Sequence, residues 1–185
     1  MTCRRKRVCP VKKAGSLDSR IRRLFQKPYK ILSPYVAEGM TVLDIGCGPG
    51  FFTVDIARMV GATGSVIACD LQEGMLQKLG RKIRGTELEG RITLHQCSPD
   101  HIGVSVMVDF VLAFYVMHEV PDPERLFGEM ASILQPKGRM LIAEPPFHVS
   151  RREFGETIRS AGDFGLLPVD RPRVLLGRTV LLEKR

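Results

Sequence analysis

The hydrophobic positions of this 185-residue chain fall into short apolar runs separated by amphipathic stretches. The runs have the length of buried strands, and the stretches repeat apolar residues at the spacing of one helix face. This pattern predicts strands at 41–45, 66–69, 92–95, 109–114 and 139–144, and helices at 29–36, 52–60, 74–84, 123–133 and 151–161. Strands that alternate with crossover helices form a parallel sheet that is covered on both faces.

The end of the chain departs from this alternation. Two further strands are expected at 166–174 and 179–183, and only a short link around Gly177 joins them. Because no crossover helix fits between them, one of the two must pair antiparallel with its neighbour. The sequence therefore predicts an α/β fold with a doubly wound, mostly parallel seven-stranded sheet whose last strand is antiparallel. We assign this domain to residues 37–185 and a basic N-terminal arm to residues 1–36.

The first expected strand runs into glycines at alternate positions, Gly46, Gly48 and Gly50. A side chain at any of them would obstruct the approach of a ligand to the main chain or forbid the φ that the turn needs. Strand, tight turn and helix in this order form the site where an open α/β sheet holds a nucleotide-like ligand. The loop lacks a basic residue for phosphate, and Phe51 stands where the third glycine of the dinucleotide motif would fall.

The second expected strand ends in a carboxylate, Asp70, twenty residues after Gly50. An acid at this point accepts hydrogen bonds from both hydroxyls of a ribose. A glycine loop without a phosphate site, followed by an acid that binds ribose, fits an adenosine ligand that carries an amino acid in place of a pyrophosphate.

Residues 42–53, together with Asp70, resemble the cofactor site of the class I S-adenosylmethionine-dependent methyltransferases. Within this class the chain most resembles the small-molecule branch that contains the ubiquinone/menaquinone-biosynthesis and arsenite methyltransferases. Residues 109–122 and 134–144 are similar to the motifs at the fourth and fifth strands of that family, and the resemblance covers residues 40–146. It implies a Rossmann-like methyltransferase fold, S-adenosyl-L-methionine as cofactor and a small-molecule methyl acceptor.

The resemblance also implies roles for individual residues. Asp44 would help to order the glycine loop and the amino end of the cofactor, and Asp70 would hold the ribose. Leu71 and Met75 would flank the adenine, with plain helix–sheet packing as an equal alternative. The expected cofactor-binding residues are Asp44, Gly46, Cys47, Gly48, Gly50, Asp70, Leu71, Met75, Cys97, Ser98, Ala113 and Phe114.

The chain departs from the family after the third strand, where many members carry an acid that reads the adenine amino group. Ser98 aligns best with that acid, and its hydroxyl or a nearby backbone group can substitute for it. Asp100 is the alternative, so the adenine contact is left open between these two residues.

Three residues near the carboxyl ends of the fourth and fifth strands are candidates for catalysis: His118, Glu144 and His148. His118 can act as a general base that titrates near neutrality, or it can fix the turn that follows it, and we favour the structural role. Glu144, with His148, is the better candidate on the substrate side, although helix capping is an equal alternative for Glu144. No metal site is expected, because Cys3 and Cys9 lack a second pair of ligands nearby.

Charge is distributed unevenly along the chain. Of its net charge of +8, residues 1–30 carry +10, from eleven Lys and Arg against one Asp, and the remainder carries −2. A basic arm attracts nucleic acid or an anionic membrane surface, and a solvated terminus is the alternative that we favour. A short amphipathic helix is expected from Asp18 to Lys27, and we predict that residues 16–36 form a lid over the pocket.

The five cysteines are odd in number and scattered, so reduced thiols in the cytoplasm are expected. The sequence contains neither a secretory signal nor an apolar run of membrane-spanning length. A homodimer is compatible with these features. Two alternative functions stay open: an RNA-modifying methyltransferase that uses the basic arm, and a nicotinamide-dependent oxidoreductase. The second would want a close-packing third glycine, which this loop lacks.

Overall fold

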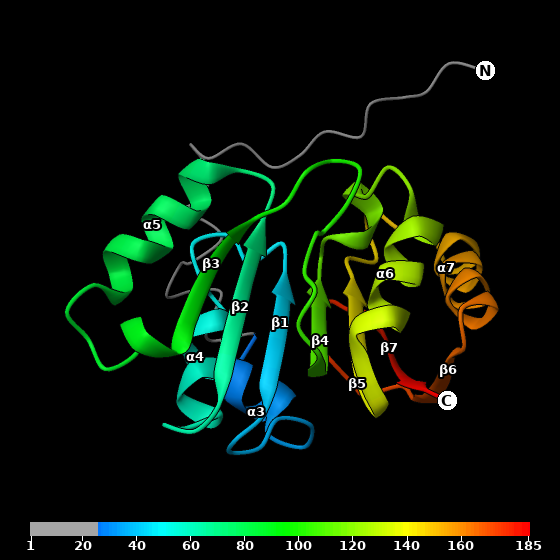
Figure 1. Ribbon diagram of the computed structural model, residues 1–185. Coiled ribbons are helices and arrows are strands. Elements are labelled where there is room, and N and C mark those ends of the chain that lie inside the picture. Colours follow the sequence, from blue (N-terminus) through cyan, green and yellow to red (C-terminus); the bar gives the residue numbers. More distant parts are fainter. Residues whose placement is uncertain (1–25) are drawn as a thin grey trace.

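The computed structural model describes residues 26–185 and shows a seven-stranded sheet in the order β3-β2-β1-β4-β5-β7-β6 (Figure 1). Neighbouring strands from β3 to β5 pair in parallel, and β7 pairs antiparallel with both β5 and β6. The predicted doubly wound sheet with an antiparallel last strand is confirmed. The strands are β1 (Thr41–Ile45), β2 (Ser65–Asp70), β3 (Ile92–Gln96), β4 (Val108–Phe114), β5 (Leu134–Glu144), β6 (Leu166–Asp170) and β7 (Arg178–Lys184).

Helices cover both faces of this sheet. One apolar core lies under α3, α4 and α5, and the other lies under α6 and α7, which pack against each other (Figure 1). The helices are α3 (Pro28–Leu32), α4 (Thr53–Met59), α5 (Glu73–Ile83), α6 (Pro123–Ile133) and α7 (Arg151–Asp163), and the 3₁₀ turns are η2 (Glu89–Arg91) and η3 (Met117–Glu119). Within residues 26–185 no helix is both long enough and apolar enough to cross a membrane.

The alternation of side chains along β1 explains why both faces need a cover. Val42 points into the core under α4, whereas Leu43 and Ile45 point into the core under α6. Successive side chains of a strand point to opposite faces, so a strand that is apolar at consecutive positions must be buried on both. The central strands therefore form the middle layer of a three-layer sandwich.

Three predicted boundaries are wrong by four or more residues. The fifth strand begins at Leu134 instead of residue 139, because Leu134 pairs with Val108 on the near side of a register shift, after which Arg139 pairs with Phe110. The sixth strand ends at Asp170 instead of residue 174, just before the segment that contains Pro172, which has no N–H to donate to a ladder. The first described helix spans Pro28–Leu32 instead of 29–36, with Pro28 in its first turn.

The predicted lid falls only partly on the described residues. The helix expected from Asp18 to Lys27 lies mainly outside them. Its continuation, α3, packs on α4, and Leu32 and Val36 are buried in the core of that face. Closure of residues 16–36 over the pocket stays a prediction.

Candidate active site

A cavity of about 190 Å³ opens at the carboxyl edge of the parallel strands. It lies where β1 and β4 are neighbours, which is the point at which the strand order of the sheet reverses. This is the position where open α/β sheets bind ligands. Most of the expected cofactor-binding residues line it: Asp44, Gly46, Cys47, Gly48, Asp70, Leu71, Met75, Cys97, Ser98 and Phe114. The two others, Gly50 and Ala113, lie outside the lining.

The glycine loop is tied to the end of β2. The backbone N–H groups of Gly46 and Cys47 donate to the carbonyl of Cys69 at 2.8 and 3.0 Å. Gly48 has a φ of 55°, and a Cβ at this position would meet no atom within 4 Å, so the space beside it is open to a ligand. Gly50 is required for a different reason: its Cβ would lie 2.4 Å from Leu79 Cδ1, so glycine here allows α5 to pack against the loop.

Asp70, the last residue of β2, lines the pocket and also holds the loop. Its two carboxylate oxygens accept hydrogen bonds from the backbone N–H of Gly48 at 2.9 Å and of Gln72 at 2.8 Å. The side chain is only 7% exposed. Burial raises the pKa of the Asp70 carboxyl above its ordinary value, and the two backbone donors partly oppose this. A buried carboxyl group with a raised pKa that lines a pocket is typical of a ligand-binding site.

Asp44 supports the start of the first crossover helix. Its Oδ2 accepts a hydrogen bond of 2.6 Å from the hydroxyl of Thr53, the first residue of α4. Asp44 is buried and also lines the pocket. Its carboxylate thus joins the end of β1 to the helix that follows the glycine loop.

The pocket is strongly acidic. No Lys or Arg is found among the described residues that line it, and its carboxylates are Asp44, Asp70, Asp100, Glu119, Asp122 and Glu129. A site of one sign attracts ligands of the opposite sign and disfavours a pyrophosphate. S-adenosylmethionine, with its positively charged sulfonium and amino groups, fits both this charge and the open space at Gly48.

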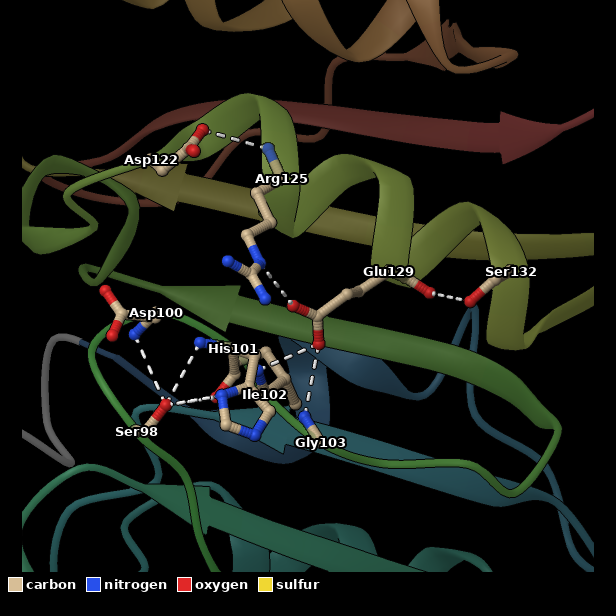
Figure 2. Close-up of polar contacts among 9 residues, drawn as sticks. All are labelled: Ser98, Asp100, His101, Ile102, Gly103, Asp122, Arg125, Glu129 and Ser132. Atoms are coloured by element: carbon tan, nitrogen blue, oxygen red, sulfur yellow. Dashed lines mark hydrogen bonds and ion pairs between the residues drawn. The ribbon is translucent and has the colours of Figure 1, made fainter.

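The loop after β3 closes one side of the pocket, and Figure 2 shows what holds it. The Ser98 hydroxyl accepts hydrogen bonds from the backbone N–H of Asp100 at 3.3 Å and of His101 at 3.2 Å, and lies 2.6 Å from His101 Nδ1. From α6, Glu129 Oε2 accepts from the backbone N–H of Ile102 at 2.8 Å and of Gly103 at 3.1 Å. Ser98 therefore organises its own loop, and Asp100 is the carboxylate of this loop that lines the pocket.

The opposite wall of the pocket is aromatic. The ring centroids of Phe52 and Phe114 lie 4.3 Å apart, and those of Phe114 and Tyr115 lie 4.5 Å apart. All three side chains line the pocket. Phe52 and Tyr115 were not among the predicted site residues, although both directly follow motif positions, one after the glycine loop and one after the fourth strand.

The candidate catalytic residues contact one another outside the lining of the pocket. Glu144, 1% exposed, accepts from the backbone N–H of Met117 at 3.0 Å, and its Oε2 lies 2.6 Å from His118 Nδ1. The rings of His118 and His148 meet edge to face at 5.7 Å. None of His118, Glu144 and His148 lines the pocket, whereas Glu119 does, and its Oε1 lies 4.0 Å from His118 Nε2.

Three cysteines, Cys47, Cys69 and Cys97, lie in or near the glycine loop, and their pKa values are shifted in different directions. A hydrogen bond from the Cys69 thiol lowers the pKa of Cys97, although burial opposes this. Burial, with Asp44 and Asp70 nearby, raises the pKa of Cys47 well above its ordinary value. Across residues 26–185 no group of three or more His, Cys, Asp and Glu side chains is placed to hold a metal ion.

Comparison with known proteins places this site in a family. Residues 37–163 match the family described as "Methyltransferase domain". The demethylmenaquinone methyltransferase of Lactobacillus johnsonii is 34% identical over 110 residues, and the ubiquinone/menaquinone biosynthesis C-methyltransferase UbiE of Haemophilus ducreyi is 31% identical over 110 residues. Each match covers 59% of this chain but only 45% and 42% of those enzymes, so the chain spans less than half of their length.

Solved structures agree with the sequence relatives. The crystal structure of an S-adenosylmethionine-dependent methyltransferase from Aquifex aeolicus superposes with a TM-score of 0.85, at 26% identity, over 96% of this chain and 100% of that one. The matched region contains the glycine loop, Asp70 and the aromatic wall. The chain therefore belongs to the methyltransferase-domain family and has the fold of the class I S-adenosylmethionine-dependent methyltransferases.

Proposed function

We propose that this chain transfers the methyl group of S-adenosylmethionine to a small acceptor with a planar, phenol-like ring. One observation carries the proposal: a single pocket joins the glycine loop and Asp70 on one side to a wall of aromatic rings on the other. Aromatic side chains favour offset or edge contacts with a planar ring. The names of two relatives, which refer to demethylmenaquinone and to ubiquinone/menaquinone biosynthesis, support an acceptor of this kind.

The cofactor half of the pocket would act by binding and orientation. When bound, S-adenosylmethionine supplies a methyl carbon on a positively charged sulfur, so the protein mainly has to align the acceptor with it. Gly46 and Gly48 would offer backbone along the cofactor, and Asp70 retains lone pairs beyond the two that its loop contacts use. Those lone pairs can accept hydrogen bonds from the two ribose hydroxyls.

The part of the pocket that binds the methyl acceptor would also need a group that removes a proton from it. A phenolic ring becomes a strong carbon or oxygen nucleophile only when it is deprotonated. We assign this role to Glu119, the carboxylate beside the aromatic wall. A proton on His118 Nδ1, donated to Glu144, leaves Nε2 as the acceptor that faces Glu119. Once Glu119 has taken up the proton, His118 Nε2 could accept a hydrogen bond from it, and Glu144 would hold His118 in this tautomer.

A methyl-transfer assay tests this assignment. Purified chain, labelled S-adenosylmethionine and short-chain hydroquinones are expected to give labelled, methylated rings. Glu119→Gln is expected to lower kcat by about a hundredfold or more while cofactor affinity stays within a few fold, because only the proton acceptor is removed. Glu124→Gln, an exposed carboxylate at the start of α6, is the control.

Two results would contradict the proposal. Methylation that reaches amines or nucleic acid but no phenolic ring would exclude the acceptor class. Unchanged kcat in Glu119→Gln would exclude Glu119 as the proton acceptor and leave the cofactor assignment intact.

A further inference from the structure

The loop between β6 and β7, residues 171–177, exposes two leucine side chains where the pocket opens. Leu175 and Leu176 are 57% and 50% exposed. The loop is joined to the pocket, because the hydroxyl of Tyr115, a lining residue, donates to the carbonyl of Leu176 at 2.5 Å. The two leucines therefore lie beside the pocket and not on a remote part of the surface.

The backbone of this loop is fixed in an unusual conformation. Leu176 has a φ of 60°, in the left-handed region that residues with a side chain rarely adopt. Val174 is buried, and its carbonyl accepts the backbone N–H of Gly177 at 3.0 Å. Strain of this kind persists only where the surrounding structure holds it, and it concentrates at functional sites. The exposure of the leucines is thus a property of an ordered loop.

The same loop is basic. Arg171 and Arg173 are exposed, and neither forms an ion pair with another side chain of residues 26–185. Arg178 follows the loop directly, and no acidic residue occurs from 171 to 178. Cationic and apolar side chains therefore share a short stretch of surface, and the charges at 171 and 173 have no ion-pair partner among the described residues.

Two other segments lie close to this loop through its neighbours Tyr115 and Arg178. The Nε2 of Gln26 donates to the Tyr115 hydroxyl at 2.7 Å, so the basic arm, with eleven Lys and Arg in residues 1–30, enters the described structure beside Leu176. On the other side, Arg178 Nε donates to the carbonyl of Val149 at 3.0 Å. That bond joins the loop to the turn after β5, whose Phe147 is 83% exposed.

We propose that this surface, formed by residues 171–178 with Phe147, docks the chain on an anionic lipid membrane. Exposed leucine and phenylalanine side chains enter the boundary between head groups and acyl chains, and arginines pair with anionic head groups. Nucleic acid would neutralise the arginines but leave the leucines in water, so lipid fits both halves of the surface. Docking in this place would bring the pocket entrance to the bilayer, where an apolar acceptor can enter without crossing water.

The inference does not depend on the proposed acceptor, and vesicle binding tests it separately from activity. The full chain is mixed with vesicles of phosphatidylcholine alone or with added phosphatidylglycerol, and sedimented binding is measured at low and high salt. We expect binding to the anionic vesicles, weak binding to neutral ones and release by salt. Leu175→Ser/Leu176→Ser is expected to weaken binding about tenfold or more, and Arg171→Gln/Arg173→Gln about 25-fold, at roughly fivefold per charge.

Matched controls lie at the other edge of the sheet and at the carboxyl end of α5. Leu94→Ser, on β3 and 39% exposed, and Arg81→Gln/Arg84→Gln, both exposed, are expected to bind vesicles like the parent chain. Unchanged cofactor binding in the leucine variant would show that its fold is intact.

Three results would overturn the proposal. One is equal binding to neutral and anionic vesicles. Another is that both loop variants bind vesicles as tightly as the parent chain, while removal of residues 1–25 abolishes vesicle binding. The arm alone would then be the lipid contact. The third is retention of the chain by single-stranded RNA with no binding to anionic vesicles.

Discussion

At the scale of single residues, the environment decides what chemically similar groups do. Asp70 and Glu144 are both almost fully buried carboxylates at strand ends. Asp70 lines the pocket and holds the glycine loop by accepting hydrogen bonds from backbone N–H groups. Its remaining lone pairs are available to a ligand in the pocket. Glu144 accepts from the turn after β4 and from His118, so it supports the wall of the site from behind. The sequence places both at the carboxyl edge of the sheet and assigns the ribose contact to Asp70, but it leaves Glu144 open between a substrate-side and a capping role.

The cysteines around the pocket show the same effect and give a prediction. The Cys69 thiol donates to Cys97 and lowers its pKa, whereas the pKa of Cys47 is raised by burial. The thiolate is the reactive form, and an ordinary cysteine has a pKa of about 8.5. Alkylation of Cys97 by iodoacetamide is therefore expected to reach half of its maximal rate at a pH below that value. Mass spectrometry of the alkylated peptides measures each site.

The variant Cys69→Ala removes the donor, so the midpoint of Cys97 alkylation is expected to move to higher pH. Cys47 is expected to react slowly throughout, and bound cofactor should protect Cys97, which lines the pocket. Equal midpoints for Cys97 in the parent and in Cys69→Ala would contradict the assigned hydrogen bond.

At the scale of elements, the loop after β3 depends on a helix that is distant in sequence. Residues 97–103 form no strand or helix, and Glu129 of α6 holds Ile102 and Gly103 through two backbone N–H groups. Its other oxygen is buried without a hydrogen-bond partner, and Arg125 Nε lies 3.8 Å away. One carboxylate therefore sets the position of the pocket wall that carries Ser98 and Asp100 (Figure 2).

Removal of this carboxylate should loosen the loop. Glu129→Ala leaves two backbone donors without their acceptor and is expected to lower the free energy of unfolding by about 1–3 kcal/mol. Hydrogen exchange at Ile102 and Gly103 is expected to accelerate, while exchange in β1 and β4 stays slow. Glu124→Ala, an exposed acid of the same helix, is the control and should change stability by less than about 0.5 kcal/mol. Unchanged exchange at the two amides would show that Glu129 does not hold the loop.

At the scale of the whole molecule, the sheet collects residues that are far apart in the chain. The order β2-β1-β4 brings Asp70, the glycine loop and Phe114 to one edge, and the adjacent β5 brings Glu144 behind them. The insertion of β7 beside β5 places Leu176 next to Tyr115. The pocket, the proposed proton acceptor Glu119 and the proposed lipid surface thus share one edge of the sheet.

Cofactor binding should therefore stabilise the fold as a unit. S-adenosylmethionine at about 100 times its Kd adds about 2.7 kcal/mol, which raises the Tm of a domain of this size by roughly 5–10 °C. Asp70→Asn should weaken cofactor binding by about 1–3 kcal/mol and reduce the Tm shift accordingly, and Asp163→Asn, an exposed acid on α7, should not. Differential scanning calorimetry with S-adenosylmethionine or NAD(H) measures this, and an equal shift with NAD(H) would reject the cofactor assignment.

The sequence by itself determined the fold class, the antiparallel last strand, the glycine loop and an adenosine-type ligand, because these depend on local patterns: apolar periodicity, glycine spacing and an acid at a strand end. The resemblance to the methyltransferases then identified the ligand as S-adenosylmethionine. The tertiary structure decided which residues meet. Gly50 faces Leu79 instead of the cavity, Glu119 and not His118 lines the pocket, and Phe52, Phe114 and Tyr115 form one wall. These relations depend on the register between strands and on helix packing across the sheet, and neither is encoded in the spacing of residues within a single element.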